Sequence, residues 1–406
     1  MRCVIAFDVS RKSSTMAAYN EQGDFEFEGR LIHSKTGFSN LSKIIKGLSE
    51  KNNYTLEFVF EATGVYSAAL ERFLRENNLV YYSLNPLLAH LNTQSLRRNK
   101  TDISDAHQLA KNHFKNDYLQ TYREDSYYEQ MRTMSRRYDE IMKEKIQYKN
   151  RLHASLQLSF PDFDTAFINK SKLYYNLVQV FPHPNLILKR SKTVIKNRIK
   201  KCTKKNYSLK KLEERAILLI EIAKDSFPAV DETDYSCELV RDYAKKILEM
   251  EEEQDEIIQR MTEMSKDRKE YRILRSFPGI KDKLSCRIIA ELGDLTRFKN
   301  NKQLNAYAGI DIVRYQSGSM EYKDRINKRG NSRLRGILYF MIVSMLSAKG
   351  KQINHLVDYY YKLKKQPYNK HHKVAVVACM NNFLKVAFHL IQNDLLYDYE
   401  KASSQQ

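Results

Sequence analysis

The stretch CVIAFDVS, residues 3–10, decides how the first part of the chain folds. It is short, apolar and rich in β-branched and aromatic residues, as expected of a strand buried inside a sheet. It also ends on an acid, Asp8. A carboxylate at the end of a buried strand lies where α/β proteins commonly form their sites.

Strand and helix patterns alternate over the first 125 residues. A second strand is expected near residues 14–19 and a third over FEFEGRLI (25–32). LEFVFEAT (56–63) is another buried strand, followed by the helical pattern YSAALERFLRENN (66–78) and the strand NLVYYSLNP (78–86). Hairpin strands followed by a βαβ unit predict an α/β sheet with helices on its faces.

The composition indicates a soluble protein that binds a polyanion. The 406 residues include 69 Lys and Arg against 49 Asp and Glu, a net charge of +20. A field of this size favours nucleic acid as partner, with a membrane surface the weaker alternative. No apolar run reaches the roughly 18 residues of a membrane span. The five scattered cysteines, without a C-x-x-C pair, predict a reducing, cytoplasmic location and no zinc site.

The middle of the chain, residues 126–270, reads as long helices around a basic insert. A helical pattern runs over residues 127–158, and a heptad seam runs from Val240 to Met264, interrupted by Gln254. Such a seam favours a coiled coil, either between these two helices or between subunits. Residues 186–212 hold eleven Lys and Arg and no acid, which indicates a polyanion contact rather than an ordinary solvated surface.

Four acids form the candidate catalytic set. Asp8 and Glu61 end strands, and Asp102 and Asp105 lie three residues apart in the basic stretch RRNKTDISDAHQLAK (97–111). The simpler interpretation of the last two is a helix start, with Asp102 as N-cap. If all four meet at one sheet edge, they would repel unless a divalent cation held them, and hard oxygen ligands select Mg²⁺ or Mn²⁺.

Two motifs and the last third of the chain resemble a known family. E-A-T-G at 61–64 and K-T-D-x-x-D-A at 100–106, with a C-terminal block, are similar to the DEDD transposases of bacterial insertion sequences, relatives of the Piv invertase and of bridge-RNA-guided recombinases. The resemblance covers roughly residues 1–155 and 270–350. The resemblance implies a RuvC-like RNase H fold for residues 1–125 and a mainly α C-terminal transposase domain for residues 271–406. It also implies a guide non-coding RNA, a dimer or tetramer, and two DNA partners, donor and target.

The resemblance further implies a serine nucleophile in the C-terminal domain. The family motif S-G corresponds to Ser317-Gly318, and we expect Ser317 to be the nucleophile, ahead of Ser319 and Ser332. A serine hydroxyl needs a base or a metal to activate it, and no His lies nearby, so the four-acid site is the expected activator. From the residues alone, a serine beside a glycine is more often part of a turn.

A basic segment follows the serine. Its cations are expected to bind the DNA backbone, because guanidinium groups make bidentate contacts with phosphate; they are Arg325, Lys328, Arg329, Arg333 and Arg335. The alternative is a solvated helix surface. His107, next to Asp105, is more often structural than part of a site.

These patterns predict a DNA transposase or recombinase of a bacterial insertion sequence. The alternative enzyme is a metal-dependent RuvC-like nuclease or junction resolvase, in which water attacks and no serine is needed. A third interpretation is a nucleic-acid-binding protein with an inactive RNase H fold, which the presence of all four acids argues against.

Overall fold

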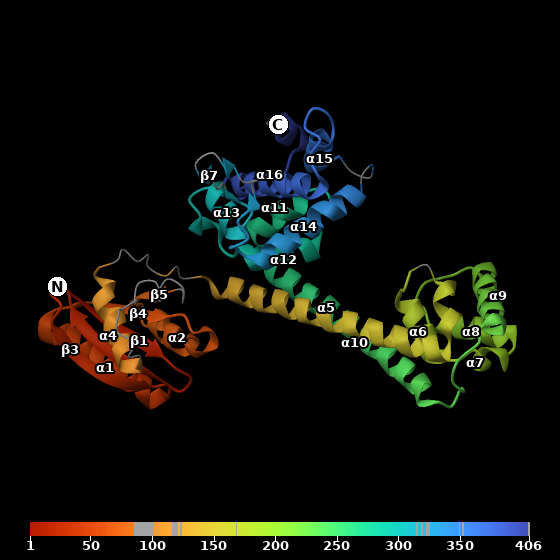
Figure 1. The fold of residues 1–406 in the computed structure, drawn as a ribbon, viewed down its shortest axis with the longest axis horizontal. Helices are drawn as coiled ribbons and strands as arrows, with labels where there is room; N and C mark the ends of the chain where they lie inside the picture. The colour runs from red at the N-terminus through yellow and green to blue at the C-terminus, as the bar shows by residue number, and fades with distance from the viewer. Residues whose placement is uncertain are drawn as a thin grey trace. The chain divides into compact units, whose positions relative to one another are not determined.

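The computed structural model describes residues 1–84, 101–115, 121, 124–167, 169–313, 316–317, 320–321, 325–348, 350 and 353–404 (Figure 1). The chain divides into two compact units, Met1–Arg123 and Glu124–Gln406. The first contains a mixed sheet with helices, and in its described residues the second is almost entirely helical.

The sheet of the first unit has the strand order β3-β2-β1-β4-β5. Strands β1 (Arg2–Val9), β2 (Ser13–Asn20) and β3 (Phe25–Ile32) form an antiparallel meander. Strands β4 (Thr55–Glu61) and β5 (Val80–Leu84) run parallel to β1. The predicted hairpin strands followed by a βαβ unit are confirmed, and β1 lies at the centre of the sheet.

Side chains of β1 alternate between two cores because successive residues of a strand point to opposite faces. Cys3, Ile5 and Phe7 pack with residues of α1 (Lys35–Asn52) and α2 (Ala68–Glu76). Val4 and Ala6 pack on the other face with α4 (Asp102–His113). Helices therefore cover both faces of the sheet. A short 3-10 turn, η1 (Gly64–Tyr66), follows β4.

A long antiparallel pair of helices, α5 (Ser126–Ser159) and α10 (Tyr235–Ser265), runs through the second unit. On α5 one set of buried positions recurs every seven residues; its members are Met131, Tyr138, Lys145, Leu152 and Ser159. On α10 they are Val240, Ile247, Gln254 and Met261. The seam expected on α10 is thus covered by α5 of the same chain. Ala244 and Ser265 complete it, while Tyr243 and Met264 are only half-buried.

One hydrophobic core of the second unit surrounds the end of the pair where α5 ends and α10 begins. It contains η2 (Pro161–Ala166), α6 (Lys172–Val180), α7 (Asn185–Leu188), α8 (Lys192–Lys201) and α9 (Leu209–Asp225). The basic run of residues 186–212 folds here, with Ile195 and Ile199 buried and most of its cations exposed. We call this part the helical tip.

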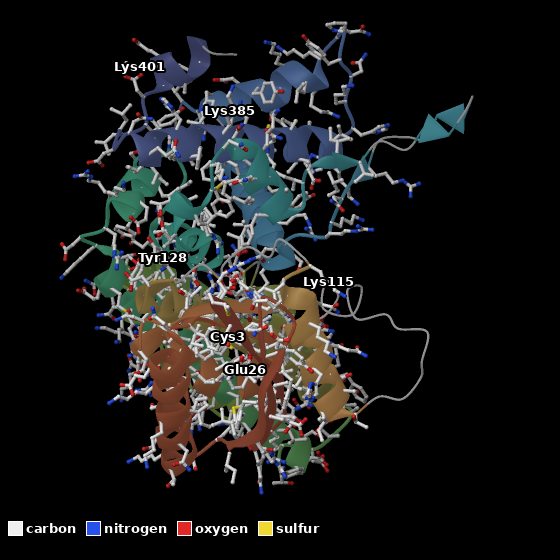
Figure 2. The ribbon with its side chains drawn as sticks, turned by 90° about the vertical axis from the view of Figure 1, so that its left-hand side faces the viewer. Cys3, Glu26, Lys115, Tyr128, Lys385 and Lys401 are labelled. Carbon is white, nitrogen blue, oxygen red and sulfur yellow. The ribbon has the colours of Figure 1, made fainter. Side chains whose placement is uncertain are left out.

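The other core lies where α5 begins and α10 ends. Its helices are α11 (Lys269–Ser276), α12 (Asp282–Leu292), η3 (Leu295–Arg297), α13 (Asn301–Ala308), α14 (Ser332–Ser347), α15 (His355–Lys364), α16 (His372–Gln392) and α17 (Tyr399–Ser404). Tyr128, labelled in Figure 2, anchors α5 here, because its hydroxyl donates a 3.0 Å hydrogen bond to Glu270. In the described residues, α16 has the length and composition of a membrane span, but 56% of that stretch is buried inside the unit.

Candidate functional site

Asp8 and Glu61 end two neighbouring strands. β1 and β4 are parallel and in register from Arg2 opposite Thr55 to Phe7 opposite Phe60, so the two acids lie side by side at one sheet edge. Phe7 and Phe60 both face the core under α1 and α2. The alternation of a strand therefore turns Asp8 and Glu61 to the opposite face, which α4 covers. Both carboxylates are half-buried.

Asp102 and Asp105 lie in the first turn of α4. The expected helix start is confirmed, but Thr101 is the N-cap and accepts a hydrogen bond from the amide of Ser104 in a capping box. At 3.6 residues per turn, both acids lie on the side of Leu109. His107 lies on the other side of the helix and contacts strand β2. The acids consequently lie on the flank of α4 that faces away from β2.

The donor types suit a hard cation, since all four groups are carboxylates, which Mg²⁺ and Mn²⁺ prefer. Asp8 and Glu61 also share one edge and one face of the sheet. Within the described residues, however, no three His, Cys, Asp or Glu side chains lie close enough together to hold a metal ion. The convergence of all four acids on one point stays a prediction.

His107 has a structural role beside this site. Its Nδ1 lies 2.8 Å from the hydroxyl of Tyr19, and its Nε2 lies 2.6 Å from Glu28 Oε2. These contacts tie α4 to strands β2 and β3. The structural interpretation of this histidine is therefore supported over a role next to a metal.

Ser317 lies in a short hairpin of the second unit. Strand β7 (Gln316–Ser317) pairs with β8 (Met320–Glu321), with Ser317 opposite Met320. Gly318 and Ser319, the second candidate, lie outside the described residues. Ser332, the third candidate, is the exposed first residue of α14.

The segment Lys328–Asn331 is bound closely to the end of α13. The amide of Lys328 donates to Gly309 O at 3.0 Å, and that of Asn331 donates to Tyr307 O at 2.6 Å. A Cβ at Gly330 would lie 2.2 Å from Tyr307 O, so only glycine allows this approach. The close approach of the two segments therefore explains the glycine at position 330.

The expected phosphate-binding cations differ in their surroundings. Arg325 lies in β9 (Arg325–Ile326), a strand that pairs with β6 (Ile312–Val313). Four of the cations are exposed, namely Arg325, Lys328, Arg329 and Arg333. Arg335 is half-buried and donates a 2.9 Å hydrogen bond from Nη1 to Ala308 O, at the end of α13. Arg335 thus has a structural contact that the other four lack among the described residues.

A buried acid near this segment escaped the sequence analysis. Glu291, near the end of α12, is fully buried, and its Oε2 accepts a 2.8 Å hydrogen bond from the side chain of Asn331. Arg136 of α5 approaches the other oxygen at 3.7 Å. The available signal was an acid directly after the apolar run Ile288–Ala290 and before Leu292. Glu291 holds the basic segment in place through Asn331 and is not a candidate nucleophile.

All five cysteines are free thiols and lie within the described residues. Burial raises the pKa of Cys3, which lies inside the sheet (Figure 2), to about 12, with a smaller contribution from Glu26. Burial likewise raises the pKa of Cys379 to about 12. These two thiols are too weakly ionised to act as nucleophiles near neutral pH.

Comparisons with known proteins agree at both ends of the chain. A model of IS110-type DEDD transposases, described as a transposase, matches residues 5–161. A second, described as the transposase IS116/IS110/IS902 family, matches residues 271–358. A protein of Streptomyces coelicolor, assigned as the transposase for the IS117 mini-circle, is 23% identical over 149 residues, 36% of this chain. The match spans 34% of that relative's length. The chain belongs to the IS110 family of DEDD transposases.

Proposed function

We propose that this protein cuts and rejoins DNA during the movement of an insertion sequence, with Ser317 as nucleophile. The observation that carries the proposal is the placement of Asp8 and Glu61 side by side at one sheet edge, on the face that α4 covers. The strand order β3-β2-β1-β4-β5 supports a RuvC-like RNase H fold for the first unit. Membership of the transposase family supports DNA as the substrate.

The four acids provide the ligands for Mg²⁺ or Mn²⁺. Such an ion stabilises charge on the attacked phosphate and favours ionisation of the attacking hydroxyl. Asp8 and Glu61 supply two fixed ligands from adjacent strands, and Asp102 and Asp105 supply two more from α4. The proposal requires the first turn of α4 to close on the strand ends when the metal binds.

Ser317 forms a phosphoester with DNA in this proposal. Its oxygen bonds to phosphorus as the bond to the adjoining nucleotide breaks, and the reverse step joins a new strand without free ends. Arg325, Lys328, Arg329 and Arg333 hold the phosphates beside it, because they are exposed cations on one short segment. A guide RNA and assembly into a dimer or tetramer complete the proposal and follow from the family resemblance.

The experiment is a denaturing gel of labelled element-end DNA after incubation with Mg²⁺. Wild-type protein should give a protein-linked DNA band, and Ser317→Ala should abolish it while leaving DNA binding intact. Ser319→Ala is the matched control two residues away. Asp102→Asn should abolish cleavage by removing a charge from the metal ligands.

Two results would revise the proposal. Loss of the band in Ser319→Ala alone would move the nucleophile by two residues. Cleavage by Ser317→Ala at the wild-type rate, with no adduct in any lane, would identify a nuclease that uses water.

A further inference from the structure

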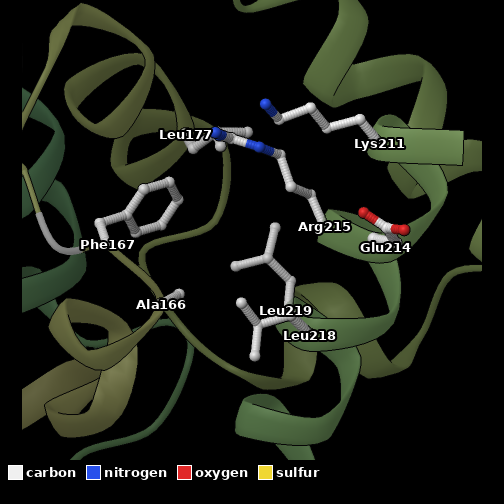
Figure 3. Close-up of a pocket in the computed structure, with 8 residues that line it drawn as sticks. All are labelled: Ala166, Phe167, Leu177, Lys211, Glu214, Arg215, Leu218 and Leu219. Carbon is white, nitrogen blue, oxygen red and sulfur yellow. The ribbon is translucent and has the colours of Figure 1, made fainter. Parts of the chain in front are cut away.

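The helical tip contains an open pocket of about 290 Å³ (Figure 3). It lies between the end of η2 and helix α9 and is lined by Ala166, Phe167, Leu177, Lys211, Glu214, Arg215, Leu218 and Leu219. Its volume is close to the lower end of small-molecule sites, about 300 Å³. Such a space suits one ring system rather than a large ligand.

The walls of the pocket are apolar and include a fixed aromatic ring. Phe167 stacks on Phe163 with ring centroids 5.4 Å apart and meets Tyr174 edge-on. Leu219 is buried on the opposite wall, whereas Leu218 is 40% exposed. An immobilised ring beside an exposed leucine provides an apolar surface for a planar group.

Two cations line the same pocket. The guanidinium of Arg215 lies 4.8 Å from the ring centroid of Tyr207, which holds it from outside the pocket. In Figure 3 the side chain of Arg215 extends towards Leu177 along one side of the pocket, with Lys211 on the same side. Among the described residues neither cation forms an ion pair, whereas Lys192 is paired with Glu213 at 2.6 Å. Of the described lining residues only Glu214 is acidic.

We propose that this pocket binds an unpaired nucleotide of a single-stranded nucleic acid. The base packs against Phe167 and the leucines, and the adjoining phosphate contacts Lys211 and Arg215. Stacking on an aromatic ring next to cations is how proteins hold single strands with little sequence preference. A base inside a duplex is paired and stacked on its neighbours, so it enters such a pocket only after being flipped out of the helix, which costs the free energy of unpairing and unstacking. RNA and DNA share this chemistry.

The inference deepens the proposed function, since it takes the chain to be a nucleic-acid-binding protein, but it does not depend on cleavage. The experiment uses the full chain without Mg²⁺ and measures fluorescence anisotropy with labelled strands of about 15 nucleotides. One arm is single-stranded RNA, one is DNA of the same sequence, and the third is the DNA duplex. The variants are Phe167→Leu, Arg215→Gln and the exposed-residue change Leu218→Glu, with Lys192→Gln as the control outside the pocket.

The three pocket variants should each weaken single-strand binding by about five- to 100-fold. Binding to the duplex should change less than about twofold, and Lys192→Gln should change neither appreciably. A larger loss of affinity for RNA than for DNA would identify a guide strand as the source of the nucleotide. A larger loss for DNA would identify a melted element end. A 4-thiouridine or 4-thiothymidine strand should cross-link to residues 160–171 or 207–219.

Single-strand binding by all three variants at the wild-type affinity would overturn the pocket proposal. So would an equal loss of single-strand and duplex binding, because that pattern reflects net charge alone. Failure of the cleavage proposal would appear only in the gel with Mg²⁺, so the two failures are distinguishable.

Discussion

The side-chain amide of Asn331 donates a 2.8 Å hydrogen bond to Oε2 of Glu291. This bond joins the N-cap residue of α14 to the buried end of α12. The amide oxygen of Asn331 accepts 3.0 Å hydrogen bonds from the backbone of Arg333 and Leu334. The side chain of Asn331 therefore caps α14 and also donates a hydrogen bond to a carboxylate that is fully buried. This places the segment Lys328–Asn331 firmly against the core.

Replacing the side-chain donor of Asn331 should therefore destabilise the protein. A second change that supplies a donor at position 291 should restore the lost stability. Asn331→Asp keeps the cap but sets two carboxyl groups together, and we expect it to lower the free energy of unfolding by about 3 kcal/mol. Adding Glu291→Gln restores a donor and should recover most of the loss. Denaturant unfolding of the wild type, both single variants and the double variant measures the coupling. Additive effects of the two changes would show that the pair is not coupled.

Salt dependence should separate the free cations of the helical tip from the paired ones. Lys200, Lys201, Lys204 and Lys205 are exposed and form no ion pair among the described residues. Each change to Gln should reduce the slope of log K against log salt for duplex DNA by up to about 0.9, because one fewer counterion is released. Lys189 and Lys192 are paired with Glu232 and Glu213 and serve as controls. An unchanged slope in the variants of these four unpaired lysines would show that they form a solvated surface rather than a contact with DNA.

The strands and their order along the chain could be predicted because each strand carries its own signal, whereas their order within the sheet became visible only in the structure. CVIAFDVS and LEFVFEAT are short apolar runs bounded by turn residues, and both became central strands. The seam of α10 was predicted less well. Large residues at Tyr243 and Met264 suggested its line, but Ala244 and Ser265 are the buried residues. A small residue allows close helix approach, and sequence alone does not reveal where a partner helix lies.

The site was predicted in part for a similar reason. That Asp8 and Glu61 end buried strands follows from local patterns, whereas the parallel pairing of β1 with β4 that brings them side by side is a long-range contact. The distance of Asp102 and Asp105 from them depends on how α4 crosses the sheet, which no short motif encodes. Glu291 was missed because its partner, Asn331, lies forty residues later in the sequence. Long-range pairs of this kind become visible only in the fold.

Stability should fall in mild acid through His355. This ring is fully buried with its Nδ1 2.8 Å from the Tyr397 hydroxyl, and burial lowers its pKa from 6.5 to about 4. The unfolded chain thus binds the proton first, so stability is lost as pH falls from 6.5 towards 4, by about 2 to 3 kcal/mol. Unfolding at pH 7 and 4.5 should show a smaller difference for His355→Gln than for the exposed control His371→Gln. Equal differences would contradict the assignment.

The last prediction concerns the polar layer inside the helix pair. Nζ of Lys145 donates a 2.6 Å hydrogen bond to Oε1 of Gln254, and Glu251 lies 3.7 Å from the same ammonium. Gln254 in turn donates to Tyr138 O at 3.3 Å. Burial lowers the pKa of Lys145, partly offset by Glu251. The layer therefore places a long polar side chain at one matched position on each helix, in the middle of the seam.

Removing one partner should destabilise the protein, and removing both should not. Gln254→Leu leaves the Lys145 ammonium without its closest acceptor and should cost about 1 to 3 kcal/mol. Lys145→Leu with Gln254→Leu replaces the polar pair by two apolar side chains and should equal or exceed the stability of the wild type. A single polar layer fixes register and partner choice in helix pairs, so the double variant should also form additional oligomers. Denaturant unfolding and light scattering test the two effects separately. A double variant less stable than Gln254→Leu alone would show that the layer contributes to stability itself rather than to the choice of partner.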